Sequence, residues 1–160
     1  VFPHTLAPLM RFLLPLALLA LTAAPALAQD PGAEPLYGDV RLEEGFPNDP
    51  YDIEVTAGGT EEVSERGCNY GFVADAPDVD LYYTTSGSST LYIYAVSSED
   101  TTILVNLPDG SWACDDDSYG DGDPILVIPG ADAGLYDIWV GTYGDDLVEA
   151  TLFISEIDPR

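Results

Sequence analysis

Five aspartates within nine residues form the densest group of side chains that could do chemistry in this sequence. They are Asp115, Asp116, Asp117, Asp121 and Asp123. Calcium takes six to eight oxygen ligands and tolerates irregular loops, and a divalent cation would relieve the repulsion among crowded carboxylates. The spacing is not that of an EF-hand, because a register that begins at Asp117 places Ile128 where the bidentate glutamate belongs. We expect either a calcium-binding loop with these five ligands or a solvated acidic loop after a strand.

The sequence contains one pair of cysteines, Cys68 and Cys114. In an oxidising compartment such a pair forms a disulfide by default, and a closed loop of this length adds about 4 kcal/mol in the chain-entropy account. A pair of metal ligands and two free thiols are the alternatives, but a cysteine pair without a nearby histidine makes a poor zinc site. We expect a disulfide between Cys68 and Cys114.

The first 28 residues have the pattern of a secretory signal peptide. Arg11 supplies the positive charge, an apolar run follows at 12–21, and Ala26-Leu27-Ala28 is a small-x-small cleavage signal. Met10 is an alternative translation start. The apolar run is too short for a stable membrane span, and no second run of spanning length follows. We expect cleavage after Ala28, and a mature chain that is secreted or periplasmic and not inserted in a membrane.

The exported part is strongly acidic and lacks most catalytic side chains. The 160 residues carry 29 acids, four arginines and no lysine, a formal net charge of -25. Loss of Arg11 with the signal peptide makes the charge of residues 29–160 -26, which argues against binding nucleic acid or anionic membranes. The only histidine, His4, would be lost as well. Serine–histidine, cysteine–histidine and serine–lysine nucleophile systems and catalytic zinc are then excluded, so we expect no enzyme.

With only carboxylates available, one catalytic alternative remains. In glycosidases, two carboxylates act as a pair, one as general acid and the other as base or nucleophile. Such a site also needs aromatic platforms, although the same aromatic residues serve equally well as core or cross-strand pairs. Tyr92 and Tyr94 fall on one face of an expected strand, and this ladder is where a carbohydrate or peptide would make contact. A glycan hydrolase and a carbohydrate-binding module therefore stay open as alternatives.

β-Strands must position these side chains, because the apolar residues recur with a period of two. The clearest strands are 51–57 and 148–154, where apolar and polar residues alternate. Further strands are expected at 71–75, 79–84, 90–97, 101–107, 111–114, 124–128 and 135–142. Turn sequences such as Pro108-Asp109-Gly110 separate them. Many short strands with frequent turns predict an all-β fold, a single antiparallel, jelly-roll-like β-sandwich.

The ordered motifs resemble a known family, the bacterial pre-peptidase C-terminal domain and its small exported relatives. The motifs are the stretch from Asp100 to Ser111 with its Pro108-Asp109-Gly110 turn, the loop Cys114-Asp115-Asp116-Asp117-Ser118, and Gly134-Leu135-Tyr136 before a final hairpin. The resemblance covers roughly residues 46–156. It implies a β-sandwich of the kind appended to secreted peptidases, thought to assist export, targeting or substrate contact. No peptidase domain accompanies the motifs, so we expect no peptidase activity.

The leading expectation is an exported, non-enzymatic binding or accessory module. It would consist of a signal peptide at 1–28, an acidic, proline-containing tether at 29–45 and a sandwich domain at 46–158. Calcium is the candidate cofactor if the acidic loop binds a metal, a protein or glycan is the expected partner, and a monomer is the expected state. An inert acidic structural protein, stabilised by salt alone, is a further alternative.

Overall fold

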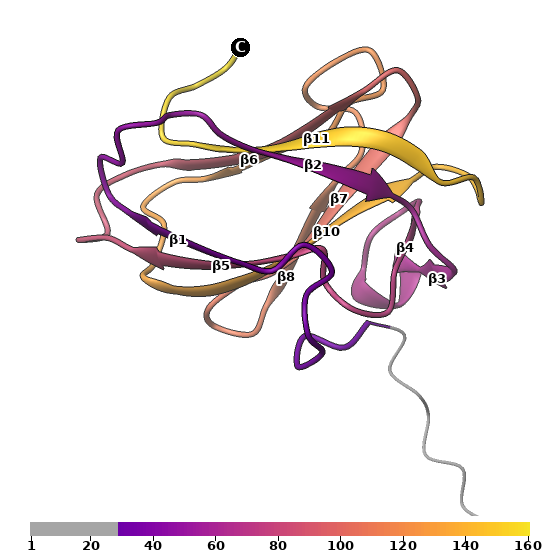
Figure 1. The fold of residues 1–160 in the computed structure, drawn as a ribbon, viewed down its shortest axis with the longest axis horizontal. Coiled ribbons are helices and arrows are strands. Elements are labelled where there is room, and N and C mark those ends of the chain that lie inside the picture. Colours follow the sequence, from indigo (N-terminus) through magenta and orange to yellow (C-terminus); the bar gives the residue numbers. More distant parts are fainter. Residues whose placement is uncertain (1–28) are drawn as a thin grey trace, which may run out of the picture.

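The computed structural model describes residues 29–160, so the predicted signal peptide lies outside the described residues. This part of the chain folds into two β-sheets packed face to face (Figure 1). The smaller sheet is antiparallel, in the order β2 (Tyr51–Ala57), β11 (Val148–Ser155), β6 (Leu91–Ser97) and β9 (Ile125–Ile128). The predicted all-β sandwich is therefore confirmed.

The larger sheet is built around β10 (Gly134–Thr142), the longest strand. One side of β10 pairs with β5 (Val79–Thr84) and then β4 (Phe72–Val73), which pairs with β3 (Glu61–Glu62). The other side pairs with β7 (Thr101–Asn106), and β7 pairs with β8 (Trp112–Asp115). The strands expected from alternation thus all form, with ends that shift by a few residues.

The main core lies between the sheets and uses the alternation seen in the sequence. In β5, Val79, Leu81 and Tyr83 point inward and are almost fully buried. Their partners across the sandwich include Ile93 of β6 and Leu152 of β11, in the same core cluster. Apolar burial is the dominant favourable term in folding, so these alternating positions specify which face of each sheet is inside.

A second apolar cluster lies on the outer face of the larger sheet. It contains Val63, Cys68, Val73, Leu104 and Trp139, with Trp112 and Cys114 packed against it. The segment that covers it includes η1 (Val63–Arg66), one 3-10 turn that ends at Gly67 in the left-handed conformation. The predicted disulfide between Cys68 and Cys114 is present and joins this segment to the end of β8. No helix within residues 29–160 is long and apolar enough to cross a membrane.

The expected tether at 29–45 is wrong, because this segment is part of the domain. It contains β1 (Asp39–Glu43), which runs parallel to β5 at the edge of the larger sheet, beside it in Figure 1. Val40 and Leu42 are buried in the main core. Before β1, the backbone N–H groups of residues 30, 36 and 37 donate to carbonyls of residues 75, 77 and 78. Backbone hydrogen bonds of this kind do not depend on amino-acid composition. The content of proline and acids in this segment therefore predicted a tether wrongly.

Candidate functional site: an acidic, tyrosine-lined end of the sandwich

The carboxylate of Asp115, the first of the five predicted ligands, holds the loop that follows β8. One oxygen accepts the Ser118 hydroxyl at 2.6 Å, and the other accepts the backbone N–H groups of Ser118 and Ile125, both at 2.9 Å. Both carboxylate oxygens of Asp115 are therefore occupied by the loop itself and by the start of β9.

Asp123, at the other end of the loop, also serves the backbone. It is buried, and its side chain accepts the N–H of Ser97 at 3.0 Å, at the end of β6. The loop is closed by backbone bonds between Asp123 and Gly120 and between Asp123 and Tyr119. Asp121 adopts a positive φ of 58°, which aspartate tolerates better than most residues. These hydrogen bonds tie the loop to the end of β6.

Asp116, Asp117 and Asp121 do not complete a metal site. Burial, followed by repulsion from Asp117, Asp116 and Asp123, raises the pKa of the neighbouring Asp100 carboxyl. The carboxylates are therefore close enough to repel one another. Among residues 29–160, however, no group of three or more acids, cysteines or histidines is arranged to hold a metal ion. The structure does not bring the five predicted ligands together, and calcium binding stays a prediction.

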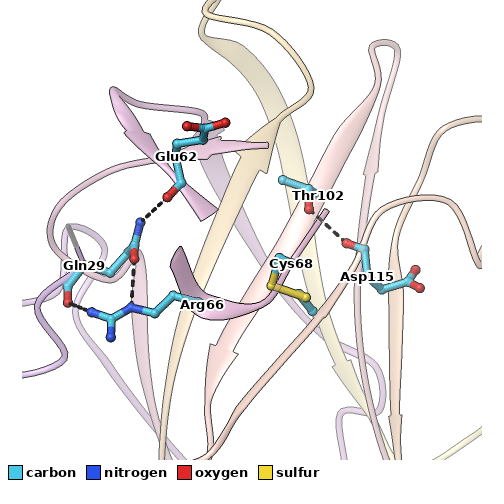
Figure 2. Close-up of a disulfide and its surroundings, with 7 residues drawn as sticks. Gln29, Glu62, Arg66, Cys68, Thr102 and Asp115 are labelled. Carbon is cyan, nitrogen blue, oxygen red and sulfur yellow. Dashed lines mark hydrogen bonds between the residues drawn. A yellow bond between two sulfur atoms is a disulfide. The ribbon is translucent and has the colours of Figure 1, made fainter. Parts of the chain in front are cut away.

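A cleft of about 290 Å³ opens beside this loop. Its walls include the Cys68–Cys114 disulfide, Tyr70, Thr102 and the acidic residues Asp115 and Asp116. The Thr102 hydroxyl donates to the backbone carbonyl of Asp115 at 3.0 Å, which fixes the wall beside the disulfide (Figure 2).

A second, smaller hollow of about 180 Å³ adjoins the first and carries more acids, among them Glu99, Asp100 and Asp146. Tyr143 forms part of its rim, and the Tyr143 ring lies 5.7 Å from the Tyr70 ring. These tyrosines are 58% and 57% exposed. We call the two hollows with their tyrosine rim the acidic cleft.

The predicted Tyr92–Tyr94 contact surface is wrong for Tyr94. Its ring stacks on Phe153, with centroids 4.9 Å apart, and lies 5.1 Å from the ring of Tyr119. These neighbours leave Tyr94 only 6% exposed. The alternation placed Tyr94 correctly on the outer face of its sheet, but it did not show that the acidic loop brings Tyr119 over that face. Tyr92 remains half-buried.

Sequence reasoning did not find Tyr70 and Tyr143, which lie in loops where no periodicity applies. Each is followed by a glycine, a weak signal of a turn at the sheet end. Gly71 has a φ of 126°, and a Cβ added there would approach the Thr102 methyl to 2.3 Å. Glycine is therefore required beside Tyr70, and it lets the chain pass close to β7 so that the ring reaches the cleft.

Buried aspartates on the outer face of the larger sheet were also missed as a group. Asp78 accepts the N–H of Val140 at 2.6 Å, and burial raises the pKa of its carboxyl to about 7. Asp80 lies opposite Asp137 in the β5–β10 register. Burial and then repulsion from Asp80 raise the pKa of Asp137 to about 6. The Asp78 carboxylate thus accepts a backbone N–H of β10 in place of a carbonyl from a neighbouring strand. The spacing of residues in the sequence does not indicate this role.

Comparison with known proteins adds no family to this geometry. No family model matches the chain, and no curated protein is significantly similar to it in sequence. The resemblance to the pre-peptidase C-terminal domain therefore rests on the motifs alone.

Proposed function

We propose that the mature chain is an exported, non-catalytic binding module, and that its acidic cleft binds a basic segment of a protein partner. The observation that carries the proposal is the joining of two acid-lined hollows by an exposed pair of tyrosines. Carboxylates attract lysine and arginine side chains, and tyrosine faces add a cation–π contribution for the same groups.

The charge of the whole molecule favours the same class of partner. Residues 29–160 carry 29 acids against three arginines, so a basic partner is attracted from a distance and an acidic one is repelled. Two of the three arginines are already held, because Arg41 pairs with Asp39 and Arg160 with Asp158. Little positive charge remains to compete for the cleft.

Non-catalytic binding is supported by the side chains that the exported part lacks. Residues 29–160 contain neither histidine nor lysine. The usual general bases for a serine or cysteine nucleophile are therefore missing from residues 29–160. An accessory role beside a secreted enzyme, as the motif resemblance implies, fits a module of this kind.

A carbohydrate is the second candidate ligand, since the exposed tyrosines could also stack on sugar rings. The planes of Tyr70 and Tyr143 are inclined at 46° to each other, so they do not form one flat platform. The acid-rich walls offer acceptors but few donors for hydroxyl groups. These two features favour the basic segment.

The proposal is tested by titrating the secreted protein with a short arginine-rich peptide, using calorimetry at low and moderate salt. We expect binding that weakens as salt rises, and none with an acidic peptide of equal length. The variant Asp100→Asn/Asp116→Asn should bind roughly tenfold more weakly, since two such charge pairs together contribute about 1–2 kcal/mol.

The matched control removes the same charge at the opposite end of the sandwich. Asp52 and Asp132 are exposed there, so Asp52→Asn/Asp132→Asn should bind the peptide as the wild type does. Equal weakening by both double variants would show that net charge, and not the acidic cleft, attracts the peptide. Preferential binding of a neutral oligosaccharide would favour the carbohydrate alternative.

A further inference from the structure

Gln29, the residue that the predicted cleavage leaves at the N-terminus, is fully buried and held at three points. Its side-chain amide N–H donates to the Glu62 carbonyl at 3.2 Å. Its side-chain carbonyl accepts Arg66 Nε at 2.9 Å, and its backbone carbonyl accepts Arg66 Nη2 at 2.7 Å. Figure 2 shows the guanidinium reaching both carbonyls of one residue. We call Glu62 and Arg66 the Gln29 seat.

The seat is itself supported from the sheet below it. The Arg66 guanidinium lies over the Trp112 ring, 4.3 Å from its centroid, and Trp112 packs on Trp139 at 5.4 Å. Trp139 is fully buried in the second apolar cluster. These contacts hold the guanidinium in place beside residue 29.

This seat poorly suits the N-terminus that cleavage first produces. A new α-amino group has an ordinary pKa of about 8 and is mostly protonated at neutral pH. That ammonium group would lie on the same residue whose two carbonyls bind the Arg66 cation. Repulsion between the two positive charges therefore opposes a protonated N-terminus in this seat.

We propose that Gln29 cyclises to pyroglutamate after signal-peptide removal, and that the Gln29 seat binds this neutral lactam. The inference rests on the proposed export. In the reaction the α-nitrogen forms a bond to the side-chain carbonyl carbon, the bond from that carbon to the amide nitrogen breaks, and ammonia leaves with the α-amino proton. No oxidant or co-reactant is needed.

The lactam offers the seat the same kinds of group as Gln29, one N–H donor and two carbonyl acceptors. The ring carbonyl is an acceptor for Arg66 Nε, the backbone carbonyl remains for Arg66 Nη2, and the ring N–H is a donor for the Glu62 carbonyl. The positive charge is gone. Cyclisation therefore keeps a donor and two acceptors for the seat and removes the repulsion with Arg66.

The first test is intact-mass and N-terminal analysis of the full chain after secretion from a bacterial host. The expected product begins at residue 29, weighs one ammonia less than the unmodified chain and has a blocked N-terminus. A free glutamine at residue 29 would overturn the lactam and leave the export prediction standing. A start at any other residue would overturn the predicted cleavage, and the lactam with it.

A second test asks whether the lactam occupies the seat. Pyroglutamyl aminopeptidase should release the N-terminal residue from folded wild type at least about tenfold more slowly than from unfolded protein, because a buried residue must first open. Arg66→Gln should restore rapid release from the folded chain, whereas Arg41→Gln, at an exposed arginine on β1, should not. Equal rates from folded and unfolded wild type would contradict the seat.

Discussion

At the scale of single residues, aspartates of identical type have opposite uses in this protein. Asp115 and Asp123 bind backbone N–H groups, and so does the buried Asp78 beside β10. Asp117, in contrast, is exposed. The sequence located the acidic loop and the hairpin turn before it. It could not rank the aspartates, because a carboxylate that caps a backbone group and one that faces water have the same local spacing.

Asp78 makes folding stability depend on pH. Its pKa rises from 3.8 to about 7 on folding, so the folded state favours the protonated carboxyl. The resulting stabilisation is complete below the unfolded pKa and is lost as the pH rises through about 7. We expect the wild type to lose roughly 2–3 kcal/mol of unfolding free energy between about pH 5 and pH 8 through this group.

Urea denaturation across this pH range tests the role of Asp78. Asp78→Asn keeps an acceptor for the Val140 N–H and cannot ionise, so its stability should fall much less with pH. Asp137 stays in both proteins and lowers both curves, since its pKa is raised as well. Parallel pH profiles for wild type and variant would show that Asp78 ionises normally in the fold.

Asp115 should matter for stability, and Asp117 should not. Asp115→Ala removes the acceptor of three hydrogen bonds and strands the Ile125 N–H, which we expect to cost about 2–3 kcal/mol in urea denaturation. Asp117→Ala at an exposed site should change stability by less than about 0.5 kcal/mol. Equal losses for the two variants would show that the carboxylates act together, as calcium ligands would.

At the scale of elements, the strands predicted from the sequence differ in a physical way from β1, which was missed together with the two-residue β3. Strands such as β2 and β11 alternate over seven or eight residues, so one buried face is visible in the pattern. β1 has only five residues, with Val40 and Leu42 between charged positions. β1 is held by parallel pairing with β5. This pairing depends on the path of the chain in three dimensions and not on the local composition of β1.

The place of β1 in the domain can be tested by truncating one of its core side chains. Leu42 is 8% exposed and packs in the main cluster. Leu42→Ala should therefore lower the unfolding free energy by about 2–4 kcal/mol in urea denaturation. Arg41→Ala, on the exposed face of the same strand, is the control with little expected effect. An undisturbed Leu42→Ala variant would restore the tether interpretation.

At the scale of the whole molecule, the excess of acids over basic residues must be screened by salt. The loop at 115–123 is tied by its own hydrogen bonds. We therefore expect thermal midpoints in millimolar calcium and in chelator to agree at equal ionic strength, while added monovalent salt raises both. A midpoint that rises only with calcium would establish the calcium site, since a ligand bound only to the native state must stabilise it.

The central claim is that a basic segment binds the acidic cleft, and amide chemical-shift mapping with an arginine-rich peptide tests it most directly. We expect the largest shifts where the cleft is built, at residues 67–70, 99–102, 114–116 and 142–146. The opposite end of the sandwich, around Asp52 and Asp132, should stay unchanged. Shifts spread evenly over the acidic surface, or concentrated at that opposite end, would contradict the account.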